Sequence, residues 1–273
     1  MSERDQALER IAAALERLAP EPKSPTDWAG HPAYLWLGEE PRALGALDAL
    51  PLTQLRRIDT QKTTLYENLK RLAEGAAAHD MLLWGARGMG KSALVRSAVR
   101  DLQNAGAHIA LVQVTPPGFA SIPQLIEALM PQPRAFLLFI DDLGFDEGDL
   151  QGNLALRSLL DGGALGRPAH IKVVVTSNRR AIVQREADSP TALHERDERD
   201  NALALADRFG LTLAFHPCDQ ATYLEIVRAY TDPLGLEIDE TEAQSWAIAR
   251  GNRSGRTAYQ FACEVAGRAG LAL

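Results

Sequence analysis

The sequence predicts an α/β fold in which helices cover both faces of a parallel sheet. The first observation is that short apolar runs alternate with helical patterns between residues 81 and 178. The second is that these runs are apolar at nearly every position, which is typical of strands buried on both faces. The third is that one run ends in two carboxylates, Asp141 and Asp142. Open sheets of this class carry their sites at the carboxyl ends of strands, so we expect a functional site there.

Composition indicates a globular chain with an ordinary core. Of 273 residues, 46% are hydrophobic and 24% are charged, which excludes disorder of the chain as a whole. The net charge of −7 argues against broad binding to a nucleic acid or an anionic membrane. Cys218 and Cys263 match no metal spacing and cannot form a disulfide framework. No apolar run reaches ~18 residues and no signal peptide begins the chain, so we expect a cytoplasmic protein without a membrane-spanning helix.

The N-terminal region, residues 1–51, is expected to be accessory. Residues 2–19 predict an amphipathic packing or dimerisation helix, because apolar residues recur there at three- and four-residue spacing: Leu8, Ile11, Leu15 and Leu18. Residues 20–32 contain four prolines and predict an extended linker. Residues 33–56 are interpreted as a wrapping segment with short helices.

The remainder divides into a base, residues 52–218, and a helical lid, residues 219–273. The base alternates predicted helices and strands: helices at 64–75, 91–106, 122–132 and 152–163, and strands at 81–85, 108–115, 135–142 and 170–178. The stretch 185–200 is highly charged and predicts a solvated loop or surface helix. Strand-like content returns before residue 219, and only helical patterns follow.

A phosphate-binding motif follows the strand at 81–85. The run fits G-x-x-x-x-G-K-[ST] and consists of Gly85, Ala86, Arg87, Gly88, Met89, Gly90, Lys91 and Ser92. Glycines let successive N–H groups turn inward and cradle phosphate oxygens. Lys91 supplies positive charge to the β- and γ-phosphates, and the Ser92 hydroxyl suits Mg²⁺. The alternative is a glycine-rich turn without a ligand.

The acidic strand end supplies candidates for metal binding and catalysis. Asp141 is placed to hold Mg²⁺, and Asp142 to orient or deprotonate the attacking water. The alternative is a strand end followed by a turn at Asp142. About 50 residues after a phosphate loop, the functional interpretation is favoured.

Three further polar residues are candidates at the same site. Asn178 ends the strand at 170–178 and would position water or the γ-phosphate, although Asn also favours turns. Arg208 would stabilise transition-state charge at a neighbouring subunit's nucleotide, and Arg256 at its own. Most arginines are solvated surface charges, so a surface role is the alternative for both residues.

The order of these motifs resembles the AAA+ ATPases, and more narrowly a bacterial family of AAA-type ATP-binding proteins of undefined cellular role. The resemblance spans residues 52–267 and rests on Gln61-Lys62, GARGMGKSALV, FLLFIDDLGF, LLDGGALGRP, VVVTSNRR, LADRFGL and NRSGRTAYQF. It implies a P-loop three-layer sandwich with a five-stranded parallel sheet, a small C-terminal lid, and bound ATP and Mg²⁺. It also implies a homo-oligomer, with Asp141 as Walker B residue, Asn178 as sensor one, Arg208 as finger, and Arg256 (less well Arg253) as sensor two.

One departure from the AAA+ pattern affects the expected function. Active members commonly end the acidic strand in Asp-Glu, whereas this chain has Asp141-Asp142. The shorter side chain would hold water differently by about 1 Å, which can cost about 10²-fold in rate. We therefore expect either an ATPase that remodels an unidentified protein partner, with 185–200 as a partner-facing insertion, or a slow ATP-dependent switch or loader. A P-loop kinase is disfavoured because no acceptor signature is visible, and nucleic acid binding is open but not favoured.

Overall fold

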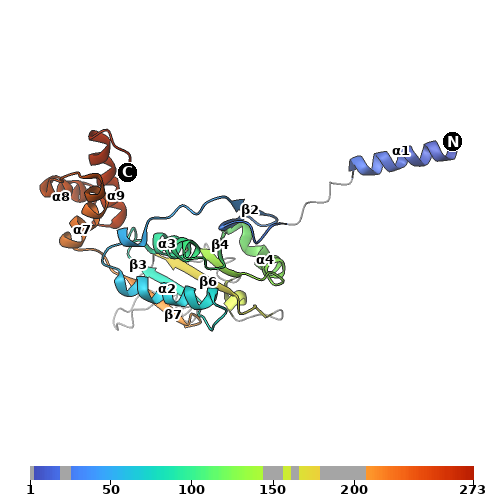
Figure 1. Cartoon of the computed structure of the whole chain (residues 1–273), viewed down its shortest axis with the longest axis horizontal. Helices are drawn as coiled ribbons and strands as arrows, with labels where there is room; N and C mark the ends of the chain where they lie inside the picture. Colours follow the sequence, from blue (N-terminus) through green and yellow to red (C-terminus); the bar gives the residue numbers. More distant parts are fainter. Residues whose placement is uncertain (1–2, 19–25, 144–155, 161–165, 179–206) are drawn as a thin grey trace, which may run out of the picture.

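A seven-stranded sheet forms the centre of the molecule in the computed structural model (Figure 1). The structure describes residues 3–18, 26–143, 156–160, 166–178 and 207–273. The strand order is β2-β1-β4-β5-β6-β3-β7, and all neighbours are parallel except β1 and β2. The strands are β1 (Ala33–Trp36), β2 (Pro41–Leu44), β3 (Met81–Gly85), β4 (Ile109–Val114), β5 (Ala135–Ile140), β6 (Ile171–Ser177) and β7 (Leu211–Phe215).

Helices cover both faces of this sheet, as the continuous apolar strands predict. The helices are α1 (Glu3–Leu18), α2 (Asp59–Ala73), α3 (Lys91–Asn104), α4 (Ile122–Leu129), α7 (Gln220–Thr231), α8 (Glu240–Ala249) and α9 (Gly255–Arg268), with a further helical stretch at 156–160. Single-turn 3-10 helices occur at Leu52–Gln54 and Asp232–Leu234, and a longer one at Pro116–Ser121.

The core divides into two layers, one on each face of the sheet. One layer packs α2 and α3 against alternate strand residues such as Leu83, Leu137 and Val174. The other packs α4 and the 156–160 helix against the intervening residues, such as Leu138 and Val173. Each fully buried side chain of this kind contributes about 1.5–3 kcal/mol, so the two layers hold the strands in a fixed register.

This register brings the carboxyl ends of three central strands to one edge. Trp84 of β3 lies opposite Ser177 of β6, and Ile140 of β5 lies opposite Val175 of β6. The chain leaves each strand at this edge, so the glycine-rich loop, the two aspartates and Asn178 come together although they are far apart in sequence.

The structure of residues 33–56 differs in part from the short helices expected from the sequence. Residues 33–44 form β1 and β2 rather than short helices, so the sheet has seven strands and not five. Strand β1 adds to β4 in parallel and buries Tyr34 and Trp36. The Arg134 guanidinium holds the preceding chain in place by donating to the carbonyls of Trp28, Ala29, His31 and Ile109. A strand of four residues is too short to show periodicity, and its pairing partner lies more than 70 residues away.

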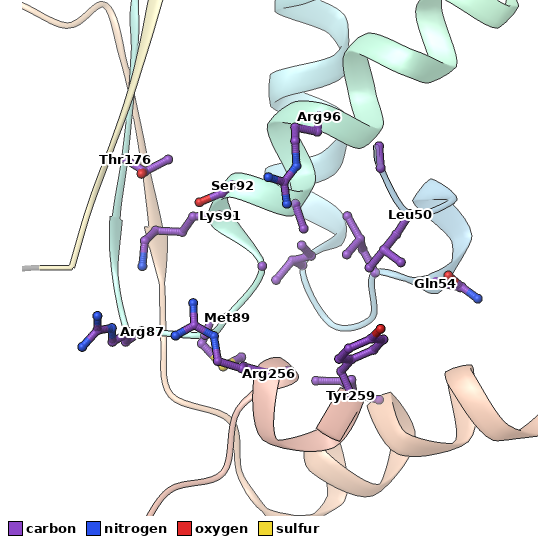
Figure 2. A pocket seen from close by; sticks show the side chains of 18 of the residues that line it. Leu50, Gln54, Arg87, Met89, Lys91, Ser92, Arg96, Thr176, Arg256 and Tyr259 are labelled. Carbon is purple, nitrogen blue, oxygen red and sulfur yellow. The ribbon is translucent and has the colours of Figure 1, made fainter. Parts of the chain in front are cut away.

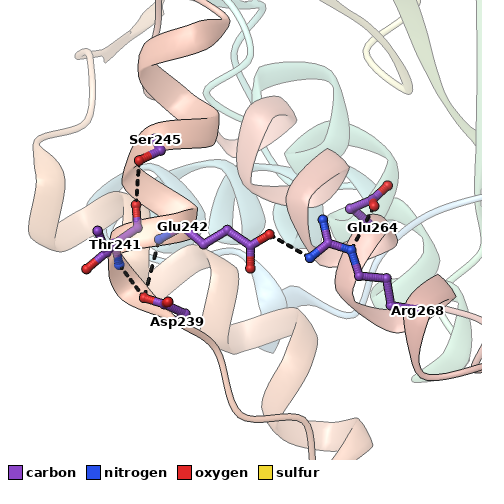
Figure 3. A network of polar contacts seen from close by, with 6 residues as sticks. All are labelled: Asp239, Thr241, Glu242, Ser245, Glu264 and Arg268. Carbon is purple, nitrogen blue, oxygen red and sulfur yellow. Dashed lines mark hydrogen bonds and ion pairs between the residues drawn. The ribbon is translucent and has the colours of Figure 1, made fainter.

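The C-terminal helices α7, α8 and α9 form a small bundle beside the sheet (Figure 1). They bury a separate cluster that includes Tyr223, Val227 and Phe261. Side chains cap their N-termini: Asp219 accepts from the N–H of Thr222, Asp239 from Thr241, and Ser254 from Thr257. Arg268 of α9 bridges Glu242 of α8 and Glu264, so polar contacts also join these two helices (Figure 3).

Helix α1 confirms the predicted N-terminal helix and lies apart from the sheet (Figure 1). Its side chains Leu8 and Ile11 are more than half exposed. No helix in the described part of the chain is long and apolar enough to cross a membrane. The charged segment 185–200 and most of the helix predicted at 152–163 lie outside the described residues.

Candidate functional site

The glycine-rich loop turns sharply between β3 and α3. Gly85 has φ of 120°, and a Cβ there would lie 2.2 Å from the carbonyl oxygen of Phe215 in β7. The N–H of Ala86 donates to that same oxygen at 2.7 Å. Gly90 precedes α3 with φ of 87°, in the left-handed region that glycine adopts without strain. The two glycines therefore let the loop leave β3 close to β7 and enter α3.

Lys91 is buried at the start of α3, with 6% of its surface exposed. Its Nζ donates at 2.9 Å to three oxygens: the carbonyls of Gly85 and Ala86 and Oδ1 of Asn178. Desolvation lowers the pKa of Lys91 to about 8, against the opposing influence of Asp142 and Asp141. Because these three hydrogen-bond acceptors are neutral oxygens, the positive charge of Lys91 is available to an anionic ligand.

The two aspartates lie directly after β5 and contact different partners. Asp141 Oδ1 accepts from Ser92 Oγ at 2.5 Å and from Thr176 Oγ1 at 2.6 Å. Asp142 accepts a hydrogen bond from the Asn178 amide, and its backbone φ is 54°. The structure thus brings together Lys91 and Ser92 of the glycine-rich loop, both acids and Asn178.

The lid contacts the glycine-rich loop through backbone atoms. The N–H of Arg256 donates to the carbonyl of Gly88 at 3.1 Å. A Cβ on Gly88 would lie 2.9 Å from Ser254 Oγ and 3.2 Å from Arg256 Cβ, so only glycine permits this approach. Figure 2 shows the Arg256 side chain beside Met89 of the loop. Arg256 lines the cavity described next, whereas Arg253 is not among its lining residues.

A cavity of about 480 Å³ opens between the glycine-rich loop, the lid, and the edge of the sheet that carries Asp141 and Asp142, called the acidic edge below. Its volume lies within the range of small-molecule sites. The polar wall is formed by residues 87–92 with Asp141, Asp142 and Asn178. The opposite wall comes from the chain before α2 and from the lid. Its apolar side chains are Leu50, Leu55, Ile58, Ile226, Tyr230 and Tyr259, and the polar Asp48, Gln54 and Arg56 stand beside them. Figure 2 shows Tyr259 facing the segment that carries Leu50.

Two contributions to this cavity were not anticipated from the sequence. Thr176 lines the cavity and contacts the acidic edge, although the sequence analysis selected only Asn178 from this strand end. The segment containing Leu50 and Leu55 supplies part of the apolar wall. The two hydroxyl residues at the end of this strand, Thr176 and Ser177, were a visible signal. The segment containing Leu50 and Leu55 carries no motif, so only its position over α3 in the structure reveals it.

Arg208 is not part of this cavity. It is an exposed turn residue shortly before β7. Strand β7 begins opposite Met81, the first residue of β3, whereas the loop follows the last residue of β3. Arg208 therefore lies toward the opposite end of the strands, and within one chain the structure does not bring it to the glycine-rich loop.

The residues at the acidic edge fit a divalent cation that arrives with a ligand. Among the described residues, no group of three or more His, Cys, Asp or Glu side chains would hold a metal unaided. Ser92 Oγ and Asp141 Oδ1 are 2.5 Å apart and are both hard oxygen donors. Mg²⁺ commonly takes one or two protein oxygens and completes its shell with water and phosphate, which this pair would permit.

The arginines near the C-terminus do not form a free basic surface. Arg268 is paired with Glu242 and Glu264 (Figure 3), and the Arg250 guanidinium lies 3.4 Å from the centre of the Trp246 ring. Of the four arginines at positions 250, 253, 256 and 268, two are thus committed to contacts within the lid. The structure gives no added support to a nucleic acid surface there.

Comparisons with known proteins place this geometry in context. A family model described as "Protein of unknown function (DUF815)" matches residues 29–269. No curated protein matches. Among solved structures, an Aeropyrum pernix ORC2 protein determined as ADPNP and ADP complexes is 16% identical, with a TM-score of 0.55, over 83% of this chain and 66% of that one. The Aeropyrum pernix ORC1 protein in complex with DNA is 17% identical, with a TM-score of 0.55, over 81% and 62%.

A Thermotoga maritima RuvB variant is also similar, at 18% identity and a TM-score of 0.47, over 75% of this chain and 59% of that one. The chain thus spans about 60% of the length of these solved proteins. At such identities the likeness concerns the fold alone. The AAA+ P-loop fold expected from the sequence is confirmed, with two more strands than expected.

Proposed function

Since the chain belongs to the DUF815 family of proteins of unknown function and has an AAA+ fold, we propose that it binds ATP with Mg²⁺ and hydrolyses it. The observation that carries this proposal is the convergence of Lys91, Ser92, Asp141, Asp142 and Asn178 on one cavity between base and lid. A cavity with the buried Lys91 and the metal-binding candidates at one end and apolar side chains at the other matches a nucleoside triphosphate with its Mg²⁺.

Binding is assigned to the loop, the lid and the apolar wall. The N–H groups of residues 85–92 would cradle the phosphates, and Lys91 would supply charge to the β- and γ-phosphates. Ser92 and Asp141 would hold Mg²⁺, which neutralises charge on the phosphate oxygens when bound. Arg256 is proposed to contact the phosphates from the lid. The apolar wall around Leu50 and Tyr230 would accept the base.

Hydrolysis is assigned to the acidic edge. Asp142 would orient a water molecule and accept its proton as the water oxygen attacks the γ-phosphorus and the bond to the β-phosphate oxygen breaks. Asn178 would donate its amide N–H to the γ-phosphate or to the water. Because Asn178 contacts both Lys91 and Asp142, it joins the binding and hydrolytic groups.

A second candidate function is an ATP-dependent switch with very slow turnover. The observation that favours it is that Asp142, which stands where AAA+ ATPases commonly have Glu, is already hydrogen bonded to Asn178. A short acid occupied by a neighbour is poorly available to a water molecule. In this alternative, ATP changes the position of the lid and a partner reads that state.

The test is steady-state phosphate release from Mg-ATP, measured beside nucleotide affinity. For the ATPase, we expect Asp142→Asn to lower release at least about 10²-fold while binding ATP within a few-fold of wild type. Lys91→Ala should abolish release and weaken ATP binding at least about 10²-fold. Asp232→Asn, an exposed lid acid outside the cavity, serves as the matched control and should change neither.

The two functions give different outcomes in this experiment. If wild type binds ATP but releases phosphate no faster than Lys91→Ala, the switch is supported and hydrolysis is excluded. If wild type and Lys91→Ala bind ATP equally, both functions fail.

We also propose that the protein works as a homo-oligomer in the cytoplasm and acts on a protein partner. The support is the position of Arg208, which is exposed and away from its own cavity, as a residue serving a neighbouring subunit's nucleotide would be. The charged segment 185–200 is the part of the chain proposed to face this partner.

A further inference from the structure

We infer that Thr176 is a positioning residue that sets the geometry of both aspartates; this rests on the proposed ATPase site. Thr176 lies near the end of β6 with 1% of its surface exposed. Its Oγ1 donates to Asp141 Oδ1 at 2.6 Å and accepts from the N–H of Asp142 at 2.8 Å. Its carbonyl accepts from the N–H of Leu143 at 2.9 Å. One residue therefore fixes three consecutive residues of the acidic edge.

The three hydrogen bonds of Thr176 to Asp141, Asp142 and Leu143 are called the Thr176 clamp below. The backbone conformation of Asp142 explains why they are needed. Asp142 has φ of 54°, in the left-handed region that residues other than glycine seldom adopt. A backbone of this kind persists where its surroundings over-determine it. Here the N–H groups of Asp142 and Leu143 donate to the hydroxyl and the carbonyl of Thr176, and these two hydrogen bonds hold the turn on both sides. The same turn leaves the Asp142 carboxylate against the Asn178 amide.

The position of Thr176 in the sheet suits this function. It pairs with Leu83 of β3 and shares a sheet face with Val174, which packs in the α3 layer. It therefore faces the helix that carries Ser92, and Thr176 and Ser92 donate to the same oxygen of Asp141. A β-branched side chain has a stiff χ1, so the hydroxyl is held in one direction. Valine would fill the same space but would neither donate to Asp141 nor accept from Asp142.

This clamp bears on the departure from the Asp-Glu pattern. Aspartate is shorter than glutamate, so its reach depends more strongly on the backbone that carries it. By fixing the turn at Asp142, Thr176 determines where the short carboxylate points. It also holds the carboxylate of Asp141, the proposed Mg²⁺ ligand. Outer-shell partners of ligating carboxylates contribute about 10–100-fold to metal affinity or activity.

The test compares Thr176→Val and Thr176→Ser by calorimetry with a non-hydrolysable ATP analogue, once in Mg²⁺ and once in EDTA. We expect Thr176→Val to keep the wild-type affinity in EDTA within about twofold, and to lose about 10–100-fold of the gain that Mg²⁺ provides. Thr176→Ser keeps the hydroxyl and should recover most of that gain. Thr231→Val removes another buried threonine hydroxyl, in α7, and should keep all of it.

Each other outcome has a definite meaning. If Thr176→Val retains the full Mg²⁺ gain, the inference fails while the proposed function stands. If its affinity falls equally in EDTA and in Mg²⁺, Thr176 is merely structural and the inference also fails. If the analogue binds wild type and Lys91→Ala equally, the proposed function fails and this inference falls with it.

A measurement on the wild-type protein covers the case in which Thr176→Val does not fold. The amides of Asp142 and Leu143 are expected to exchange hydrogen slowly, as core amides do, because both donate to Thr176. Exchange at the rate of an unstructured peptide would overturn the clamp.

Discussion

At the scale of single residues, the site is a set of polar groups that satisfy one another at the end of an apolar sheet. Lys91 contacts three oxygens, Asp141 accepts from two hydroxyls, and Asn178 links Lys91 to Asp142. Buried polar groups are costly unless they are hydrogen bonded, so these contacts stabilise the arrangement. The same groups would exchange their partners for phosphate, metal and water when a nucleotide binds.

Gly85 gives a residue-scale prediction about stability. We expect Gly85→Ala to lower the free energy of unfolding by at least about 3 kcal/mol, because it adds overpacking against Phe215 to a strained positive φ. Gly75→Ala is the matched control: its φ is 74° and nothing lies within 4 Å of the added Cβ, so it should cost about 1–2 kcal/mol. Urea unfolding measures both variants, and equal losses would contradict the close approach of β7.

At the scale of elements, the base and the lid have separate cores that meet at few points. Leu50 and Cys218 pack against both the α2–α3 layer and the lid cluster. Arg57, with φ of 60°, reaches across to Glu225 of α7 at 2.5 Å. Both residues of that pair are substantially exposed, so we expect it to be a weak link. The lid is therefore attached through a small junction, which suits movement that follows the nucleotide.

Cys218 gives an element-scale prediction about this junction. Burial raises the pKa of its thiol to about 11, so the reactive thiolate is scarce at neutral pH and increases only as the pH approaches that value. In a Cys263→Ser variant, iodoacetamide at pH 8 should label Cys218 about 10²-fold more slowly than glutathione. ATP should slow labelling further if it holds the lid against the base. Labelling as fast as glutathione would contradict the packed junction.

The sequence was informative about elements with strong local patterns and uninformative about elements defined by distant contacts. The runs that became β3 and β5 are apolar throughout and β6 is rich in β-branched residues, and the motifs at their ends led to Lys91, Asp141 and Asn178. Strands β1 and β2 have four residues each and depend on pairing with β4 and on Arg134. Such contacts leave no periodic trace in the sequence, so this segment was assigned to short helices.

The candidate site shows the same division. The glycine-rich loop and the aspartates could be predicted because each residue type is required by phosphate or metal chemistry. The clamp by Thr176 could not, because it depends on the register of β6 against β5 and on the positive φ of Asp142. The apolar wall from Leu50 and Tyr259 depends on how the lid meets the base.

At the scale of the whole molecule, the chain joins the base, for which we propose nucleotide binding, to a lid and to an exposed N-terminal helix. Arg208 lies toward the far end of β7 from the cavity, so a catalytic contribution from it requires a second subunit. The exposed apolar side chains of α1 are compatible with contacts between copies. Together these features lead us to expect activity that depends on assembly.

Arg208→Ala tests this assembly. In wild type, phosphate release per chain should rise with protein concentration, and Arg208→Ala should lower it by about 10³-fold without weakening ATP binding. Arg253→Ala, an exposed arginine that does not line the cavity, is the control and should behave as wild type. A wild-type rate per chain that is independent of concentration, together with an active Arg208→Ala, would exclude the trans contribution.

The central claim is that the cavity beside Lys91 is an ATP site. Titration calorimetry of the full chain with ATP and Mg²⁺ tests it most directly, beside Lys91→Ala. The account expects one site per chain in wild type, and at least about 10²-fold weaker binding in Lys91→Ala, because the variant removes the buried cation that meets the phosphates. Absence of binding to wild type, or equal binding to Lys91→Ala, would contradict it.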